Sequence, residues 1–117
     1  MVAYFFDTYA VIELIEGNQS YEPYAEEPAT MTIFNLAEVY WTALNRLGKE
    51  EADEVFENYR PAVVEIDDET LKAAIEFRKE HKTQDLSYTD CIGYIYAKRH
   101  GMKFLTGDKE FHDLPNV

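Results

Sequence analysis

The chain has 117 residues and a formal net charge of −12, from 11 Lys and Arg against 23 Asp and Glu. This length predicts a single domain over residues 1–117, and a hydrophobic fraction of 46% is enough for one core. Non-specific binding of nucleic acid depends on Lys and Arg that neutralise phosphates, so the composition excludes a general nucleic-acid coat protein. It favours a cationic partner, a bound metal ion or simple solubility.

Cysteine use and hydropathy indicate the compartment. Cys91 is the single cysteine of the sequence and has no partner for an internal disulfide, which is typical of a reducing environment. The sequence contains no run of about 18 apolar residues and no basic leader followed by an apolar segment. We therefore expect a cytoplasmic protein that does not enter a membrane.

The first half of the chain alternates apolar, β-prone runs with segments of helical periodicity. The first helix is expected to end at Gly17 and Asn18, which are typical of helix C-termini. Two prolines interrupt the polar segment that follows it. In chain order we expect a strand at 2–6, a helix at 8–18, a loop or short helix at 19–28, a strand at 29–33 and a helix at 34–48.

The second half repeats the alternation, with Pro61 and Gly101 marking the ends of two helices. We expect helices at 49–60, 67–81 and 87–101, strands at 62–66 and 103–106, and a short helical turn at 108–114. The strands are continuous apolar runs rather than alternating ones. This pattern predicts an α/β fold with a mainly parallel sheet whose two faces are covered by helices.

Acidic residues stand at the points where strands give way to helices. Asp7 directly follows the first strand, Glu38 lies in the first turn of the helix after 29–33, and Asp90 lies in the first turn of its own helix. Asp108 follows the strand at 103–106. Ligands of open parallel sheets bind beyond the carboxyl ends of the strands, so all four acids are candidates for one site.

Each acid taken alone also has a purely structural interpretation. "NLAE" (35–38) and "SYTD" (87–90) have the form of capping boxes, with Asn35 and Ser87 as the N-caps and with Glu38 and Asp90 at the third helical position. Asp7 and Asp108 are candidate N-caps, and each such cap contributes about 1 kcal/mol without any function. Capping and metal binding are compatible, because a helix N-terminus favours an anion in both cases.

The four acids together favour a metal site. Carboxylates that are gathered in one place repel one another unless a cation intervenes. Mg²⁺ accepts oxygen ligands from carboxylates, waters and substrate phosphates. Two such ions, about 4 Å apart, would offset the four charges and hold a phosphodiester.

Three segments resemble the motifs of PIN-domain ribonucleases, and most closely those of the small prokaryotic VapC-type toxins of toxin–antitoxin pairs. They are "FFDTYAVIE" (5–13), "NLAEVYW" (35–41) and "LSYTDCIGYIYAKRHGMKFLTGDKEF" (86–111). The last is the most specific. The resemblance implies a three-layer α/β/α sandwich and RNA cleavage that depends on one or two Mg²⁺ or Mn²⁺ ions.

By position, the resemblance also assigns the site residues. The catalytic and metal-binding acids are Asp7, Glu38, Asp90 and Asp108, with Thr8 and Thr106 as supporting hydroxyls and Glu110 as a weaker additional acid. The implied partners are an RNA substrate, an antitoxin that places a basic side chain in the acidic site, and a second copy of the chain. Residues 34–60 have the apolar and aromatic content that a homodimer interface needs.

The sequence departs from the family at Tyr9, where relatives often have Ser or Asn. This departure and the acidic composition leave an alternative function, a catalytically inactive PIN-like module for binding or assembly. Phosphoaspartyl enzymes of the dehalogenase type fit poorly, because Tyr9 stands where they require a second Asp. Other catalytic classes fit poorly too: the histidines pair with no nucleophile, Cys91 lies on an apolar stripe, and Gly-rich phosphate loops are absent.

Overall fold

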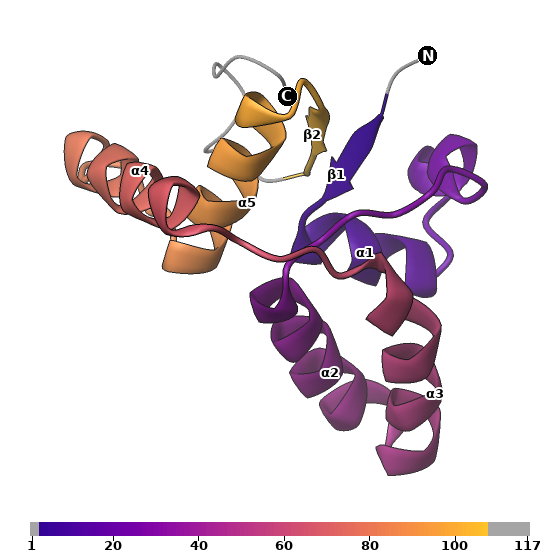
Figure 1. The fold of residues 1–117 in the computed structure, drawn as a ribbon. Helices are drawn as coiled ribbons and strands as arrows, with labels where there is room; N and C mark the ends of the chain where they lie inside the picture. The colour runs from indigo at the N-terminus through magenta and orange to yellow at the C-terminus, as the bar shows by residue number, and fades with distance from the viewer. Residues whose placement is uncertain (1–2, 108–117) are drawn as a thin grey trace.

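The computed structural model describes residues 3–107. Asp108, Glu110 and the helical turn expected at 108–114 lie outside the described residues. Figure 1 shows two short strands in the middle of the molecule, with helices on both sides of them. The helices are α1 (Thr8–Ile15), α2 (Ile33–Leu47), α3 (Lys49–Tyr59), α4 (Asp68–Glu80) and α5 (Tyr88–Arg99), with 3₁₀ helices η1 (Gln19–Tyr24) and η2 (Arg60–Ala62).

The sheet is parallel, as expected. β1 (Tyr4–Phe6) pairs with β2 (Lys103–Leu105) in a register that sets Phe5 opposite Phe104. On the other side of β1, the backbone N–H of Phe6 donates to the carbonyl of Thr30 at 2.8 Å. The N–H of the next residue, Asp7, donates in the opposite direction, to Leu105 at 3.2 Å. β1 therefore lies between β2 and the segment around Thr30.

The strands expected at 29–33 and 62–66 are much shorter than predicted. They meet in a single parallel bridge between Met31 and Val63, flanked by backbone hydrogen bonds from Met31 to Ala62 (3.1 Å) and from Val64 to Met31 (2.9 Å). Two neighbouring helices limit their length. Thr32 already caps α2, and η2 extends to Ala62 on the other strand.

The two faces of the sheet bury separate clusters of apolar residues. Successive strand residues point to opposite faces, so Phe5 and Phe104 pack with α4 and α5, whereas Phe6 packs with Val11 of α1 and Leu36 of α2. Figure 1 shows the same division, with α4 and α5 on one side of the strands and α1, α2 and α3 on the other. The expected three-layer α/β/α architecture is therefore confirmed.

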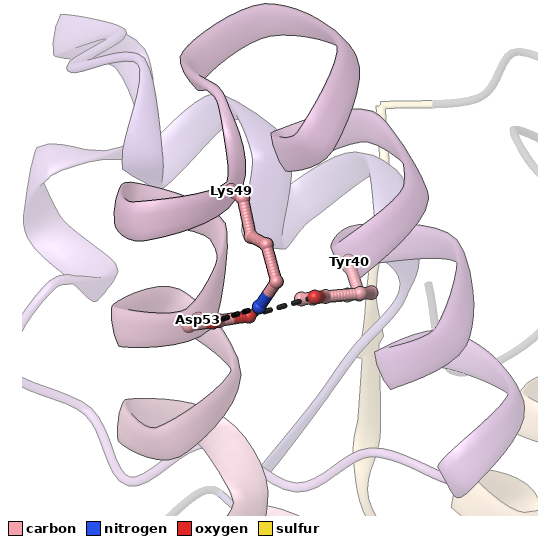
Figure 2. A network of polar contacts seen from close by, with 3 residues as sticks. All are labelled: Tyr40, Lys49 and Asp53. Carbon is pink, nitrogen blue, oxygen red and sulfur yellow. Dashed lines mark hydrogen bonds and ion pairs between the residues drawn. The ribbon is translucent and has the colours of Figure 1, made fainter.

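A polar network holds α2 against α3 (Figure 2). The Tyr40 hydroxyl donates to Asp53 Oδ1 at 2.7 Å, and Lys49 Nζ donates to Asp53 Oδ2 at 2.6 Å. The Lys49 ammonium holds the pKa of the Asp53 carboxyl below its usual range, and the Tyr40 hydroxyl adds to this effect. Within residues 3–107, no helix combines the length and the apolar composition that crossing a bilayer requires.

Gly93 lets α5 approach the sheet closely. A Cβ at this position would lie 2.7 Å from Phe5 Cε1 and 3.3 Å from Phe104 Cε1, and both rings are buried. A side chain at residue 93 would therefore force two core aromatics to move.

We predict that Gly93→Ala lowers the free energy of unfolding by about 1–3 kcal/mol, the usual effect of overpacking a core. Helix propensity alone would give the opposite sign, because Ala is favoured over Gly inside a helix by about 1 kcal/mol. Urea unfolding followed by circular dichroism measures the difference. A variant as stable as the wild type, or more stable, would show that α5 does not contact the sheet at this point.

Candidate active site

Asp7 joins β1 to α1 and is the most enclosed of the three candidate acids within residues 3–107. Its side chain is 3% exposed, and Oδ1 accepts a hydrogen bond from the backbone N–H of Ala10 at 2.8 Å, which confirms the predicted N-cap. Its own N–H bonds to Leu105 at the end of β2. A carboxylate is thus fixed where β1 and β2 end together.

Glu38 has a different local role from the one expected. The capping box of α2 is formed by Thr32 and Asn35, whose side chains accept from each other's backbone N–H groups at 3.3 and 3.0 Å. The helix therefore begins at Ile33, and the prediction of Asn35 as N-cap with Glu38 in the first turn is wrong. Glu38 lies in the second turn and is exposed, so it is not needed to cap the helix.

A pair of hydrogen bonds brings Glu38 to the residue after Asp7. The Thr8 hydroxyl donates to Glu38 Oε1 at 2.5 Å and accepts from Asn35 Nδ2 at 3.2 Å. Thr8 thus links the first turn of α1 to two residues of α2 that are three positions apart. Asn35 was not recognised as part of this group from the sequence, although a buried amide at the start of an apolar helix is itself a signal of a polar contact.

Asp90 is half-buried in the first turn of α5, where it forms the predicted capping box. The N–H of Ser87 donates to Asp90 Oδ2, and the N–H of Asp90 donates to Ser87 Oγ, both at 3.0 Å. Close to it, Arg78 donates from Nε to the carbonyl of Leu86 at 3.0 Å and places its guanidinium 4.2 Å from the centre of the Tyr88 ring. A cationic side chain of α4 therefore lies beside the start of α5, the helix that carries Asp90.

The end of β2 adjoins the start of α1. Thr106 is half-buried and directly follows Leu105, the residue that accepts from Asp7. Gly107 approaches the rings of Tyr9 and Tyr21, since a Cβ there would lie 2.7 Å from Tyr9 Cδ1 and 2.5 Å from the Tyr21 hydroxyl. The structure thus brings together Asp7, Thr8 and Glu38 with the chain that leads to Asp108.

The donor set suits a hard cation. The groups near the end of β1 are carboxylates and a hydroxyl, the oxygen ligands that Mg²⁺ and Mn²⁺ prefer. The nearby thiol does not compete, because burial raises the pKa of Cys91 to about 11, with the Asp90 carboxylate adding to the effect. Among residues 3–107, no three His, Cys, Asp or Glu side chains are grouped closely enough to hold an ion by themselves.

We predict that Thr8→Val lowers the free energy of unfolding by about 1–3 kcal/mol, the cost of leaving a buried polar group without its partner. Valine has the shape of threonine but cannot accept from Asn35, whose side chain is 1% exposed. Thr8→Ser is the matched control, because it keeps the hydroxyl and is expected to retain most of the stability. Equal stability of Thr8→Val and the wild type in urea unfolding would contradict this role of Thr8.

Comparisons with known proteins place this arrangement in a class. Over residues 4–117 the chain matches the family model described as the PIN domain. The class defined by fold and site is thus a small α/β protein with a buried acid, Asp7, at the end of a parallel strand. The chain belongs to the PIN domain family. Among curated protein sequences, none matches it.

Solved structures share the same fold at low sequence identity. A toxin–antitoxin complex from Klebsiella pneumoniae matches with a TM-score of 0.77 and 21% identity, over 98% of this chain and 95% of that one. VapC20 of Mycobacterium tuberculosis, described as a toxin that cleaves the sarcin–ricin loop, matches with a TM-score of 0.79 and 17% identity over 98% and 97%. DNA-bound VapBC from Salmonella typhimurium matches with a TM-score of 0.77 and 19% identity over 100% and 96%.

Proposed function

We propose that this protein is a metal-dependent endoribonuclease that hydrolyses RNA phosphodiester bonds as the toxin of a toxin–antitoxin pair. The observation that carries the proposal is the junction at the end of β1, where buried Asp7 is followed by Thr8 and Thr8 donates to Glu38. The family assignment supports it, as do the structural relatives described as toxins. Membership of the family makes a nuclease the leading class of activity.

Asp7, Asp90 and Asp108 would hold one or two Mg²⁺ or Mn²⁺ ions, with Glu38 binding an ion or orienting a water. When bound, such an ion supplies Lewis-acid stabilisation of the phosphoryl charge and lowers the pKa of water. The chain's own residues would orient the carboxylates that face the ion. Asp7 is held by the Ala10 N–H, and Thr8 fixes one oxygen of Glu38, so neither carboxylate has to be ordered when substrate arrives.

The overall charge agrees with an antitoxin that presents cations. A chain of net charge −12 attracts a basic segment, and a basic side chain near Asp7 and Glu38 would offset the carboxylates in place of a metal ion. Such a partner would inhibit the enzyme by occupying the site. Antitoxin and metal ion would then compete, so metal-dependent cleavage would fall as antitoxin is added.

Helix α2 offers a face for a second copy. Phe34, Trp41 and Leu44 lie at helical spacing on α2, and their side chains are 44%, 67% and 37% exposed. Exposed apolar residues grouped on one element mark interaction surfaces. We include in the proposal a cytoplasmic homodimer that forms through this region.

We predict that Asp7→Asn and Asp90→Asn each abolish Mg²⁺- or Mn²⁺-dependent RNA cleavage while the protein stays folded. An asparagine oxygen can still accept from the Ala10 and Ser87 N–H groups, so the caps survive, but the negative charge that holds a cation is lost. Cleavage of labelled RNA is measured with and without EDTA, and thermal unfolding controls for stability.

Asp53→Asn is the matched control for the loss of one carboxylate, because Asp53 belongs to the α2–α3 network rather than to the candidate site. It is expected to cleave RNA as the wild type does. A wild-type protein that binds neither divalent ion and cleaves no RNA would overturn the nuclease proposal. The alternative, a PIN-like module for binding or assembly without turnover, would then stand.

A further inference from the structure

Tyr9 is an exposed aromatic ring beside the candidate acids. It lies in the first turn of α1, two residues after Asp7, and is 47% exposed. Gly107 also contacts the ring, and it lies two residues beyond the Leu105 carbonyl that binds the Asp7 N–H. The ring is therefore close both to the first candidate acid in the sequence and to the residue that precedes Asp108.

Tyr9 is the first ring in a row of four tyrosines that pack against one another. The Tyr9 and Tyr21 ring centroids are 6.4 Å apart, Tyr21 and Tyr24 are also 6.4 Å apart, and Tyr24 meets Tyr4 edge-on at 5.3 Å. The three supporting rings are half-buried, so the row runs from the edge of the core to the surface. Tyr9 is thus the exposed end of a packed row, and little side-chain freedom remains to be lost when a ligand covers it.

The electrostatics of the row also connect it with the acids. Burial is the main cause that raises the pKa of Tyr21 to about 12, and the neighbouring Tyr9 and Asp7 contribute to the same increase. The Asp7 carboxylate therefore lies close enough to the tyrosine row for its charge to act on the Tyr21 phenol.

An acidic protein that acts on RNA needs a source of affinity other than a basic surface. Stacking of an unpaired base on an aromatic ring does not depend on neutralising phosphates, and it tolerates any base. Building on the proposed nuclease function, we propose that Tyr9 is a substrate-positioning residue. Its exposed face stacks against an unpaired base of the RNA strand and so holds the adjacent phosphate over Asp7.

Gly107 helps to determine where the Tyr9 ring lies. Any side chain at this position would collide with Tyr9 and Tyr21, so glycine permits the tyrosine row to pack against the end of β2. The contact fixes the position of the Tyr9 ring relative to the end of β2. The segment from Leu105 to Gly107 therefore positions both the ring and Asp7.

The test compares Tyr9→Phe with Tyr9→Leu. Phenylalanine keeps the flat ring, whereas leucine keeps apolar bulk for packing against Tyr21 but cannot stack on a base. Binding of a labelled single-stranded RNA of mixed sequence is measured by fluorescence anisotropy, with Ca²⁺ replacing Mg²⁺ to limit cleavage. Leu71→Ala is the control for loss of an exposed apolar side chain, because Leu71 is about as exposed as Tyr9 (42% against 47%) and belongs to α4, outside the candidate site and the proposed dimer face.

We expect Tyr9→Phe to bind RNA as the wild type does, and Tyr9→Leu to bind about tenfold more weakly, within the range found for loss of one base–aromatic contact. Leu71→Ala should leave RNA affinity unchanged. Thermal unfolding of each variant separates loss of binding from loss of folding. If Tyr9→Leu does not fold, Tyr9→Met, a more flexible side chain that also lacks an aromatic ring, takes its place with the same expected loss of affinity and the same overturning result.

Several results would overturn the inference. These are RNA affinity of Tyr9→Leu equal to that of the wild type, an equal loss in Leu71→Ala, a loss in Tyr9→Phe, and no binding of RNA by the wild type. Weaker binding of the antitoxin by Tyr9→Leu with unchanged RNA affinity would also overturn it, since the ring would then be a protein contact. Cleavage with Mg²⁺ is measured in parallel. A wild type that binds RNA but does not cut it would overturn the nuclease proposal, and the affinities of the Tyr9 variants would still test whether the ring contacts RNA.

Discussion

At the end of β1 the chain turns from strand to helix around one buried carboxylate, Asp7. Its backbone N–H binds β2 and its side chain binds the first turn of α1, so a single residue joins the sheet to the helical layer. A carboxylate that is 3% exposed would be costly without these hydrogen bonds. In the proposed nuclease the same bonds would hold the carboxylate in place to contact a cation, so that one residue would serve both the fold and the chemistry.

Much of the fold could be predicted from the sequence, because apolar runs and helical periodicity indicate which residues of a strand or helix are buried. The helices and the parallel arrangement were predicted, as were the caps by Asp7 and by Ser87 with Asp90. The lengths of the strands at 29–33 and 62–66 were not, since they are set by how soon the next helix starts or the previous one ends. The exchange of hydrogen bonds among Asn35, Thr8 and Glu38 depends on the packing of α1 against α2, which no local pattern reports.

Several residues of the candidate site lie at the same end of the sheet. Thr8 and Glu38 are joined by a hydrogen bond, and β2 delivers Thr106 and Gly107 to the same end of the sheet. Strong negative charge is then no obstacle to an RNA substrate. On the proposed function, a bound cation would attract the phosphate, an aromatic ring would hold a base, and a basic antitoxin segment would be drawn to the same acids.

Diffraction from crystals grown with Mn²⁺, recorded at the manganese absorption edge, tests the central claim most directly. The account predicts an anomalous peak bound by the Asp7 carboxylate together with carboxylates from Glu38, Asp90 or Asp108. Manganese bound elsewhere on the protein, with these four side chains directed to separate surfaces, would contradict it. The acids would then be helix caps and surface charges, and the chain would share the PIN fold without its metal chemistry.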